Sequence, residues 1–174
     1  MKATIKKRVF YICIICMCIS FKSFSQIGNR SLTCSFSQAE KGDFYMRKLN
    51  FHYYWGINPY LDIGAFSQFY WSVTKDENSA SAFIPMLGLS SRIGLLPLFN
   101  ISKSRFNIFI PIDFGLKLRV IDRVPSFPLV GIMFDYGLGA QFHLFKNIAV
   151  FGQITNGFGV TWRPYYTAGI AFVW

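Results

Sequence analysis

Charged and amide side chains recur at alternate positions of the chain, which is the spacing that places residues on one face of a β-strand. The set comprises Lys48, Asp62, Arg92, Asp113, Lys117, Arg119, Asp135, Gln141 and His143. A charge taken out of water is costly unless it is paired. If these faces point into one interior, we therefore predict a network of ion pairs and hydrogen bonds there. Such a network could form a gated polar pathway or a filled core that fixes the strand register, and we favour the filled core.

Metal and thiol chemistry have little support in the sequence. Two histidines, His52 and His143, stand at alternating polar positions without a local cluster of further ligands, and we interpret both as interior histidines with hydrogen-bond partners. Cys34 is the one cysteine after residue 25, so neither an internal disulfide nor a cysteine metal site is expected in residues 26–174. We expect no metal and no cofactor.

The first 25 residues have the layout of a secretory signal peptide. Lys2, Lys6, Lys7 and Arg8 precede an uncharged apolar run over residues 9–21, and Ser23 and Ser25 are small residues placed before a cleavage site. Removing five of the 18 basic residues leaves 13 against eight acidic ones. The remaining net charge of +5 gives no reason to expect a nucleic-acid partner. We therefore treat residues 26–174 as one domain.

Long alternating patterns dominate that domain. In residues 105–120 one face is wholly apolar, from Phe106 to Val120, while the other face carries Asp113, Lys117 and Arg119. Globular strands have about five or six residues, whereas membrane-spanning strands need about 9–11. We predict eight strands, near residues 31–38, 44–56, 60–73, 83–96, 105–119, 130–144, 148–157 and 165–174.

The distribution of polar residues favours a membrane barrel over a soluble one. A soluble barrel turns its apolar face inward, but the interior of eight strands is only just wide enough to be filled by side chains. In a membrane barrel the lipid takes the bulky apolar face, and the charged and glycine-rich face points inward. The sequence therefore predicts an all-β, eight-stranded, antiparallel, up-and-down transmembrane β-barrel. A soluble lipocalin-like binder of an apolar ligand is the alternative.

Several details follow from this arrangement. The connectors at residues 57–59 and 145–147 are expected to be short turns at one end, together with both termini. Residues 39–43, 74–82, 121–129 and 158–164 are expected at the opposite end. Because proline removes a ladder donor, we expect a β-bulge at Pro85, at Pro111 or at both, or a strand that starts after Pro85. Arg47 falls on the lipid-facing side of its strand. Aromatic residues near the strand ends suit the two membrane interfaces: Tyr53, Trp55, Phe69, Trp71, Tyr166 and Trp174.

The sequence resembles the small outer-membrane β-barrel proteins of Gram-negative bacteria, the OmpA/OmpX-like superfamily. The likeness is carried by the signal-peptide layout, by residues 136–153, which look like a strand–turn–strand hairpin, and by Gly169, Phe172 and Trp174 at the end of the chain. The resemblance implies an outer-membrane location. It also implies that Gly169, Phe172 and Trp174 are a signal for the barrel-insertion machinery, and that outer-membrane lipid surrounds a monomer.

Some barrels of this superfamily are lipid A deacylases with a His-x-Ser-Asn segment on the penultimate strand. The corresponding stretch here is Gln153, Ile154, Thr155 and Asn156. Glutamine cannot act as the general base that a hydroxyl nucleophile needs. We therefore expect a non-enzymatic barrel with a structural, surface-interaction or very narrow porin-like role, and a lipid A-modifying enzyme is the alternative.

Overall fold

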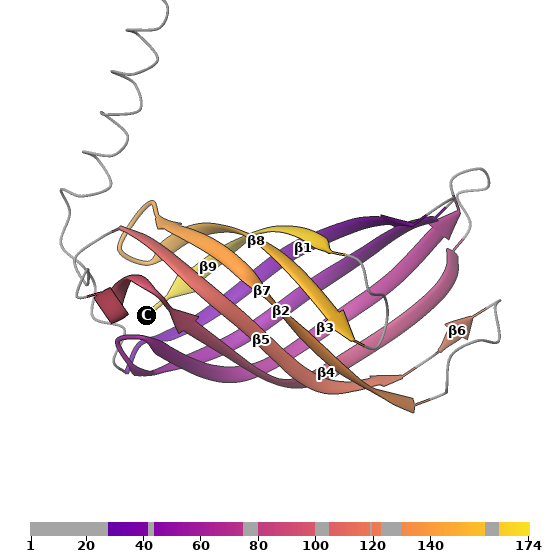
Figure 1. Cartoon of the computed structure of the whole chain (residues 1–174), viewed down its shortest axis with the longest axis horizontal. Helices are drawn as coiled ribbons and strands as arrows, with labels where there is room; N and C mark the ends of the chain where they lie inside the picture. The colour runs from indigo at the N-terminus through magenta and orange to yellow at the C-terminus, as the bar shows by residue number, and fades with distance from the viewer. Residues whose placement is uncertain are drawn as a thin grey trace, which may run out of the picture.

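The structure is a computed structural model that describes residues 28–41, 44–74, 80–99, 105–118, 120–122, 130–158 and 164–174. Eight long strands account for most of these residues (Figure 1). They are β1 (Arg30–Lys41), β2 (Phe44–Asn58), β3 (Leu61–Thr74), β4 (Ala80–Gly94), β5 (Phe106–Leu118), β7 (Val130–His143), β8 (Ile148–Phe158) and β9 (Tyr165–Val173). A two-residue strand, β6 (Ile121–Asp122), and a 3-10 helix, η1 (Leu96–Phe99), complete the described elements.

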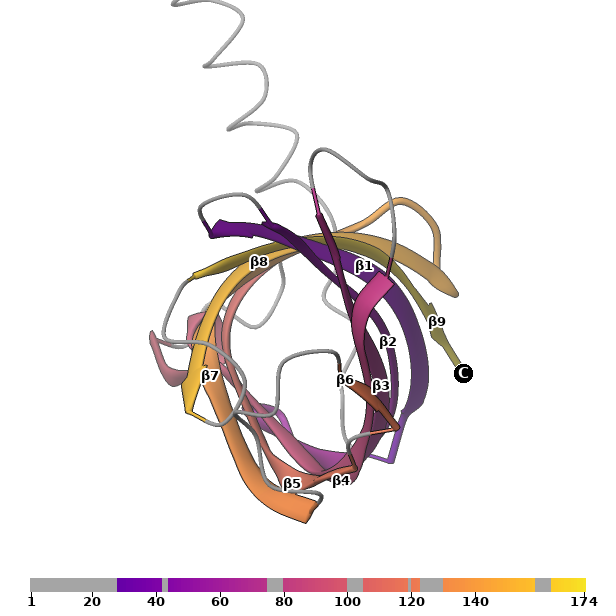
Figure 2. The ribbon, with the colours of Figure 1, turned by 90° about the vertical axis from the view of Figure 1, so that its right-hand side faces the viewer.

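The eight long strands form a closed antiparallel barrel. Their order around the ring is β3-β2-β1-β9-β8-β7-β5-β4, and β3 pairs with β4 to close it (Figure 2). The first and last strands are neighbours, with Ser31 opposite Val173 and Gln38 opposite Tyr166. Closure pairs the backbone groups of every long strand on both sides, which is the condition for a sheet to cross hydrocarbon. The predicted fold class is confirmed.

The two ends of the barrel differ in character. The β2–β3 and β7–β8 turns, η1 and the C-terminus gather at the left end of Figure 1, and the opposite ends of the strands, with β6, lie towards the right. We call these the turn end and the loop end. Residues 39–43 were expected to connect the first two strands, and the strands extend into this segment, because β1 continues to Lys41 and β2 begins at Phe44. The predicted signal peptide lies outside the described residues.

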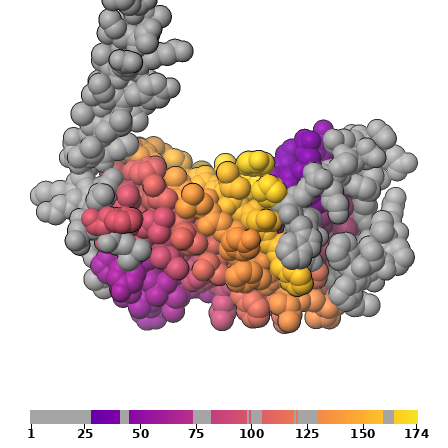
Figure 3. Space-filling view, in the orientation of Figure 1, coloured from indigo at the N-terminus to yellow at the C-terminus, as the bar shows by residue number. Residues whose placement is uncertain are grey.

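The outer and inner surfaces of the barrel follow the alternation of the sequence. On β5 the buried positions are Asn107, Phe109, Pro111, Asp113, Gly115 and Lys117, and the intervening apolar residues face outward. Large apolar side chains on the outside are well exposed, with Leu89 at 70% and Phe114 and Leu138 each at 55%. Figure 3 shows the exterior of β5, β7, β8 and β9 as one continuous surface. An exposed apolar belt around a polar interior suits lipid and not water.

Both strand prolines are accommodated without a bulge, contrary to the prediction. Pro85 keeps its place opposite Phe69, and Pro111 keeps its place opposite Arg92. On the other side of β5 the ladder to β7 lacks the pairs of Ile110 and Pro111 and resumes in the same register at Ile112. The missing proline N–H is therefore absorbed as a gap in one ladder. The register shift of this region lies instead between Ser72 and Val73.

Among the residues that the structure describes, no helix is long and apolar enough to span a membrane.

Candidate functional site

The interior of the barrel holds the polar residues that the sequence singles out, together with several that it does not. Asp113 is the centre of the largest group. Its Oδ2 accepts hydrogen bonds from Gln68 Nε2 at 3.0 Å and lies 3.1 Å from His52 Nε2, while Ser90 Oγ donates to its Oδ1. The hydroxyl of Tyr54 reaches Ser90 Oγ at 2.8 Å. Four strands, β2, β3, β4 and β5, therefore meet at one carboxylate.

A second group crosses the interior between β2 and β7. Lys48 Nζ lies 2.7 Å from Asp135 Oδ2, and both side chains are largely buried. The ammonium also lies 4.0 Å from the ring centroid of Tyr165 on β9. The two side chains form a buried salt bridge. Removing either side chain would leave the charge of the other one buried without a partner.

A third group surrounds Arg92. Its guanidinium carbon lies 4.5 Å from the ring centroid of Tyr54 and 4.4 Å from that of Phe109, so the cation is held between aromatic faces. Nη1 donates to Gln141 Oε1 at 2.9 Å, and the amide nitrogen of Gln141 lies 3.1 Å from His143 Nε2. Because the oxygen of Gln141 accepts from Arg92, its nitrogen must donate to His143. A neutral His143 therefore carries its proton on Nδ1.

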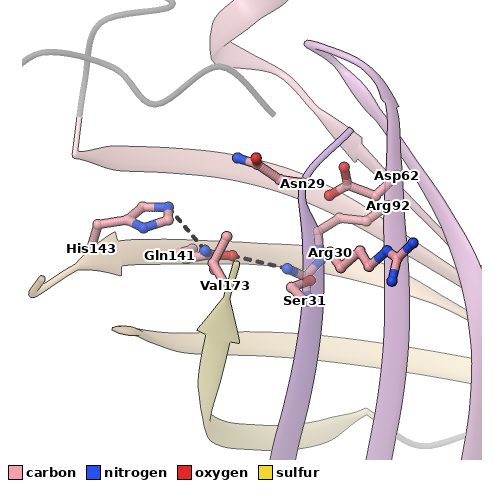
Figure 4. Close-up of a pocket in the computed structure, with 8 residues that line it drawn as sticks. All are labelled: Asn29, Arg30, Ser31, Asp62, Arg92, Gln141, His143 and Val173. Carbon is pink, nitrogen blue, oxygen red and sulfur yellow. Dashed lines mark hydrogen bonds between the residues drawn. The ribbon is translucent and has the colours of Figure 1, made fainter. Parts of the chain in front are cut away.

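The Arg92 group borders a small cavity at the turn end (Figure 4). Asp62, Arg92, Gln141 and His143 line one part of it, and residues 29–31 and Val173 line the rest. Its volume is about 30 Å³, which admits about one or two water molecules and no sugar or nucleotide. Within the described residues, no group of three or more histidine, cysteine or acidic side chains could hold a metal ion.

The loop-end half of the interior contains a cluster of apolar side chains beside Lys48 and Lys117, and the pattern of polar residues did not predict this cluster. The buried members of this cluster are Ala39, Met46, Phe66, Tyr70, Ala82, Ile84, Met86, Met133 and Tyr165. A smaller cluster of Phe109, Ala149, Phe151 and Ala171 lies towards the turn end. Strand parity places each of these residues inward, so the periodicity would have found them had it been applied to apolar residues as well as charged ones.

The structure places the predicted interior residues as follows. Lys48, Asp62, Arg92, Asp113, Lys117, Asp135 and Gln141 are buried, and His143 is half-buried. Within this set, Lys48 contacts Asp135, and Gln141 contacts both Arg92 and His143. Asp113 instead forms its hydrogen bonds with residues outside the set. Lys117 lies opposite Met86 in the loop-end half. Arg119 lies outside the described residues.

The stretch from Gln153 to Asn156 does not form a nucleophile and base. Thr155 is buried against the interior and lies opposite Gly137, and Gln153 shares this face. Asn156 is on the other face, where its side-chain oxygen accepts the N–H of Gly157 at 3.0 Å. The residue types and their directions therefore give no support to a lipid-modifying active site.

The predicted insertion residues lie on the closing strand. Gly169 faces inward between Ser35 and Phe151, and a Cβ at this position would come within 2.4 Å of Ser35 Cβ. Phe172 lies opposite Leu32 on β1 and Ile148 on β8. The backbone of Trp174 exchanges hydrogen bonds of 2.8 and 2.9 Å with Arg30, and its ring lies 6.4 Å from that of Tyr53. The last three residues therefore complete the seam of the barrel.

Known structures share this architecture. The N-terminal β-barrel domain of Pseudomonas aeruginosa OprF is similar with a TM-score of 0.56 and 8% identity, covering 87% of this chain and 100% of that one. The fold is that of the small outer-membrane β-barrels. A de novo designed transmembrane β-barrel gives a TM-score of 0.51 at 13% identity, covering 87% of this chain and 100% of that chain. The Yersinia pestis outer membrane protein Ail gives 0.50 at 12% identity, covering 84% and 99%.

Sequence comparisons add nothing to this structural likeness. No protein-family model matches the chain, and no curated protein matches it.

Proposed function

We propose that the chain is an integral outer-membrane protein whose barrel has a structural or surface-interaction role and carries no open pore. The observation that carries this proposal is the filled interior. Apolar side chains cluster in the loop-end half, where Lys48 also pairs with Asp135. Hydrogen-bonded groups around Asp113 and Arg92 cross the remainder. The cavity at the turn end holds about 30 Å³ and is bounded by Arg92 and Gln141, which are each 4% exposed. A hydrated ion needs a continuous path, and the packed side chains oppose one.

Two observations support the proposal over its alternatives. A soluble lipocalin-like binder needs a polar exterior, whereas the outside of this barrel exposes Leu87, Leu89 and Phe114 at 50% or more. A lipid-modifying enzyme needs an activated nucleophile, and Thr155 faces inward beside glutamine. Gly169, Phe172 and Trp174 would serve the insertion machinery as the closing-strand signal, and a single closed ring needs no second copy.

The proposal is tested by electrical recording of the full chain in planar lipid bilayers. Folding of the barrel is first verified by heat-modifiable migration on a gel. An absence of conductance then reflects a closed barrel and not an unfolded protein. We expect no stepwise conductance. Discrete, reproducible steps from the inserted protein would overturn the closed-barrel proposal in favour of a narrow pore. Separation of cell envelopes tests the location, and we expect the folded protein in the outer-membrane fraction.

A further inference from the structure

Arg47 is a basic side chain on the lipid-facing side of the barrel. Its neighbours Met46 and Lys48 on β2 point inward and are buried. Arg47 lies opposite Gln38 on β1 and Trp71 on β3, so it is surrounded by the outer face of the sheet. It is the third residue after Phe44, where β2 starts at the loop end. For a strand tilted by about 40°, this places Arg47 about 8 Å below the strand end.

The guanidinium of Arg47 has no anionic partner within the described part of the chain. Its Nε is shielded from solvent and has no hydrogen-bond acceptor. The contacts of Lys48 with Asp135 and of His52 with Asp113 lie inside the barrel, away from Arg47. Glu40, the acidic residue that shares this outer face on β1, lies opposite Tyr45, whereas Arg47 lies opposite Gln38. The contact found is with the ring of Tyr45, 5.8 Å from its centroid to Arg47 Cζ.

A basic side chain that faces lipid at this position is stabilised by an anion at the same depth. A guanidinium facing hydrocarbon costs about 2–4 kcal/mol at the bilayer midplane and much less near the interface. Trp71 and Tyr45 flank Arg47, and tryptophan and tyrosine mark the depth of the lipid headgroups. The anions at that depth are lipid phosphates, and the planar fork of guanidinium matches phosphate oxygens.

We propose that Arg47 binds the phosphate of an anionic membrane lipid in the leaflet at the loop end, with Trp71 and Tyr45 packing beside the lipid. This inference rests on the barrel crossing a membrane and is independent of the proposed closed interior. Lipid binding at Arg47 is compatible with a barrel that conducts ions and with one that does not. The bilayer recording and the lipid-binding test can therefore contradict the two proposals independently.

The test measures lipid bound to the full chain in uncharged detergent micelles. Dimyristoyl phosphatidylglycerol is titrated as the anionic probe and dimyristoyl phosphatidylcholine as the zwitterionic one, and bound lipid is counted by native mass spectrometry. One basic side chain at an anionic surface contributes about a fivefold change in affinity. We expect Arg47→Gln to weaken phosphatidylglycerol binding about fivefold with little change for phosphatidylcholine. Arg47→Lys is expected to retain more affinity than Arg47→Gln, because it keeps the charge but not the fork.

Lys146→Gln is the matched control, since it removes the same charge from the exposed turn that joins β7 to β8. It should leave phosphatidylglycerol affinity unchanged, and heat-modifiable migration shows that each variant is folded. Unchanged affinity in Arg47→Gln would overturn the proposal. Equal losses for both lipids would also overturn it, because binding would then not depend on the net charge of the lipid.

Discussion

The side chains of Lys48 and Asp135 meet at 2.7 Å although β1, β9 and β8 separate their strands around the ring. They are 87 residues apart in the sequence. The contact therefore spans the lumen itself and joins opposite walls of the barrel. Lys48 is 3% exposed, so its charge depends on this partner and on the face of Tyr165.

Breaking this ion pair is expected to destabilise the barrel strongly. Lys48→Met leaves the Asp135 carboxylate buried without its cation, at a cost of about 3–5 kcal/mol in the free energy of unfolding. Replacing both partners, as Lys48→Met with Asp135→Leu, should cost less than Lys48→Met alone. Urea unfolding in detergent micelles measures both values. Strictly additive losses in this double-mutant cycle would contradict a direct interaction.

Asp113 should be more sensitive to loss of its oxygens than to loss of its charge. Asp113→Ala leaves the donors of Gln68 and Ser90 and the ring of His52 without an acceptor, at about 3 kcal/mol or more. Asp113→Asn keeps one oxygen and the side-chain shape, and the Ser90 hydroxyl can turn to accept from the new amide. We expect it to lose less than half as much stability in the same unfolding assay. The reverse order would show that charge governs this group.

Gly169 and Gly152 form a matched pair for testing backbone space. A Cβ at Gly169 would lie 2.4 Å from Ser35 Cβ, 2.6 Å from Phe151 Cζ and 2.7 Å from the Cys34 carbonyl oxygen. At Gly152 the nearest atom is 3.7 Å away. Gly169→Ala should therefore lower the free energy of unfolding by about 1–3 kcal/mol, as overpacking does. Gly152→Ala should be neutral or nearly so, and similar losses in the two variants would argue against the contact with Phe151.

Removing residues 172–174 should prevent membrane insertion. The deletion takes away the Phe172 pairs with Leu32 and Ile148 and the two backbone hydrogen bonds between Trp174 and Arg30. An unpaired backbone group in lipid costs several kcal/mol. We expect the truncated chain to lack heat-modifiable migration and to leave the membrane fraction. Phe145→Ala, in an exposed turn, is the control and should insert normally. Normal insertion of the truncated chain would remove the support for a closing-strand signal.

Strand periodicity predicted most of the architecture because side-chain direction alternates strictly along a strand. Each of the eight expected strands exists, and Arg47 and Phe109 lie on the sides that parity assigns to them. Proline was a weaker guide. A missing N–H can be absorbed by a gap in one ladder, as at Pro111, without the inserted residue of a bulge.

The partners inside the barrel could not be predicted from the sequence. Pairing His52 with Asp113, or Lys48 with Asp135, depends on the stagger between strands that are not neighbours in the ring. Parity gives the direction of a side chain and says nothing about its height relative to the opposite wall. The cation–π contact between Arg92 on β4 and Tyr54 on β2 depends on the same stagger. Phe109, the other ring that contacts Arg92, lies on β5.

β2 projects Lys48, His52 and Tyr54 inward, and each reaches a side chain of a strand that is not its neighbour in the ring. These contacts act as braces across the cylinder, so flattening it would break several of them together. A braced cylinder resists lateral compression. When the apolar belt of such a barrel differs in height from the hydrocarbon thickness of the bilayer, the lipid is expected to adapt and not the barrel. The bilayer would thin or thicken locally around the protein.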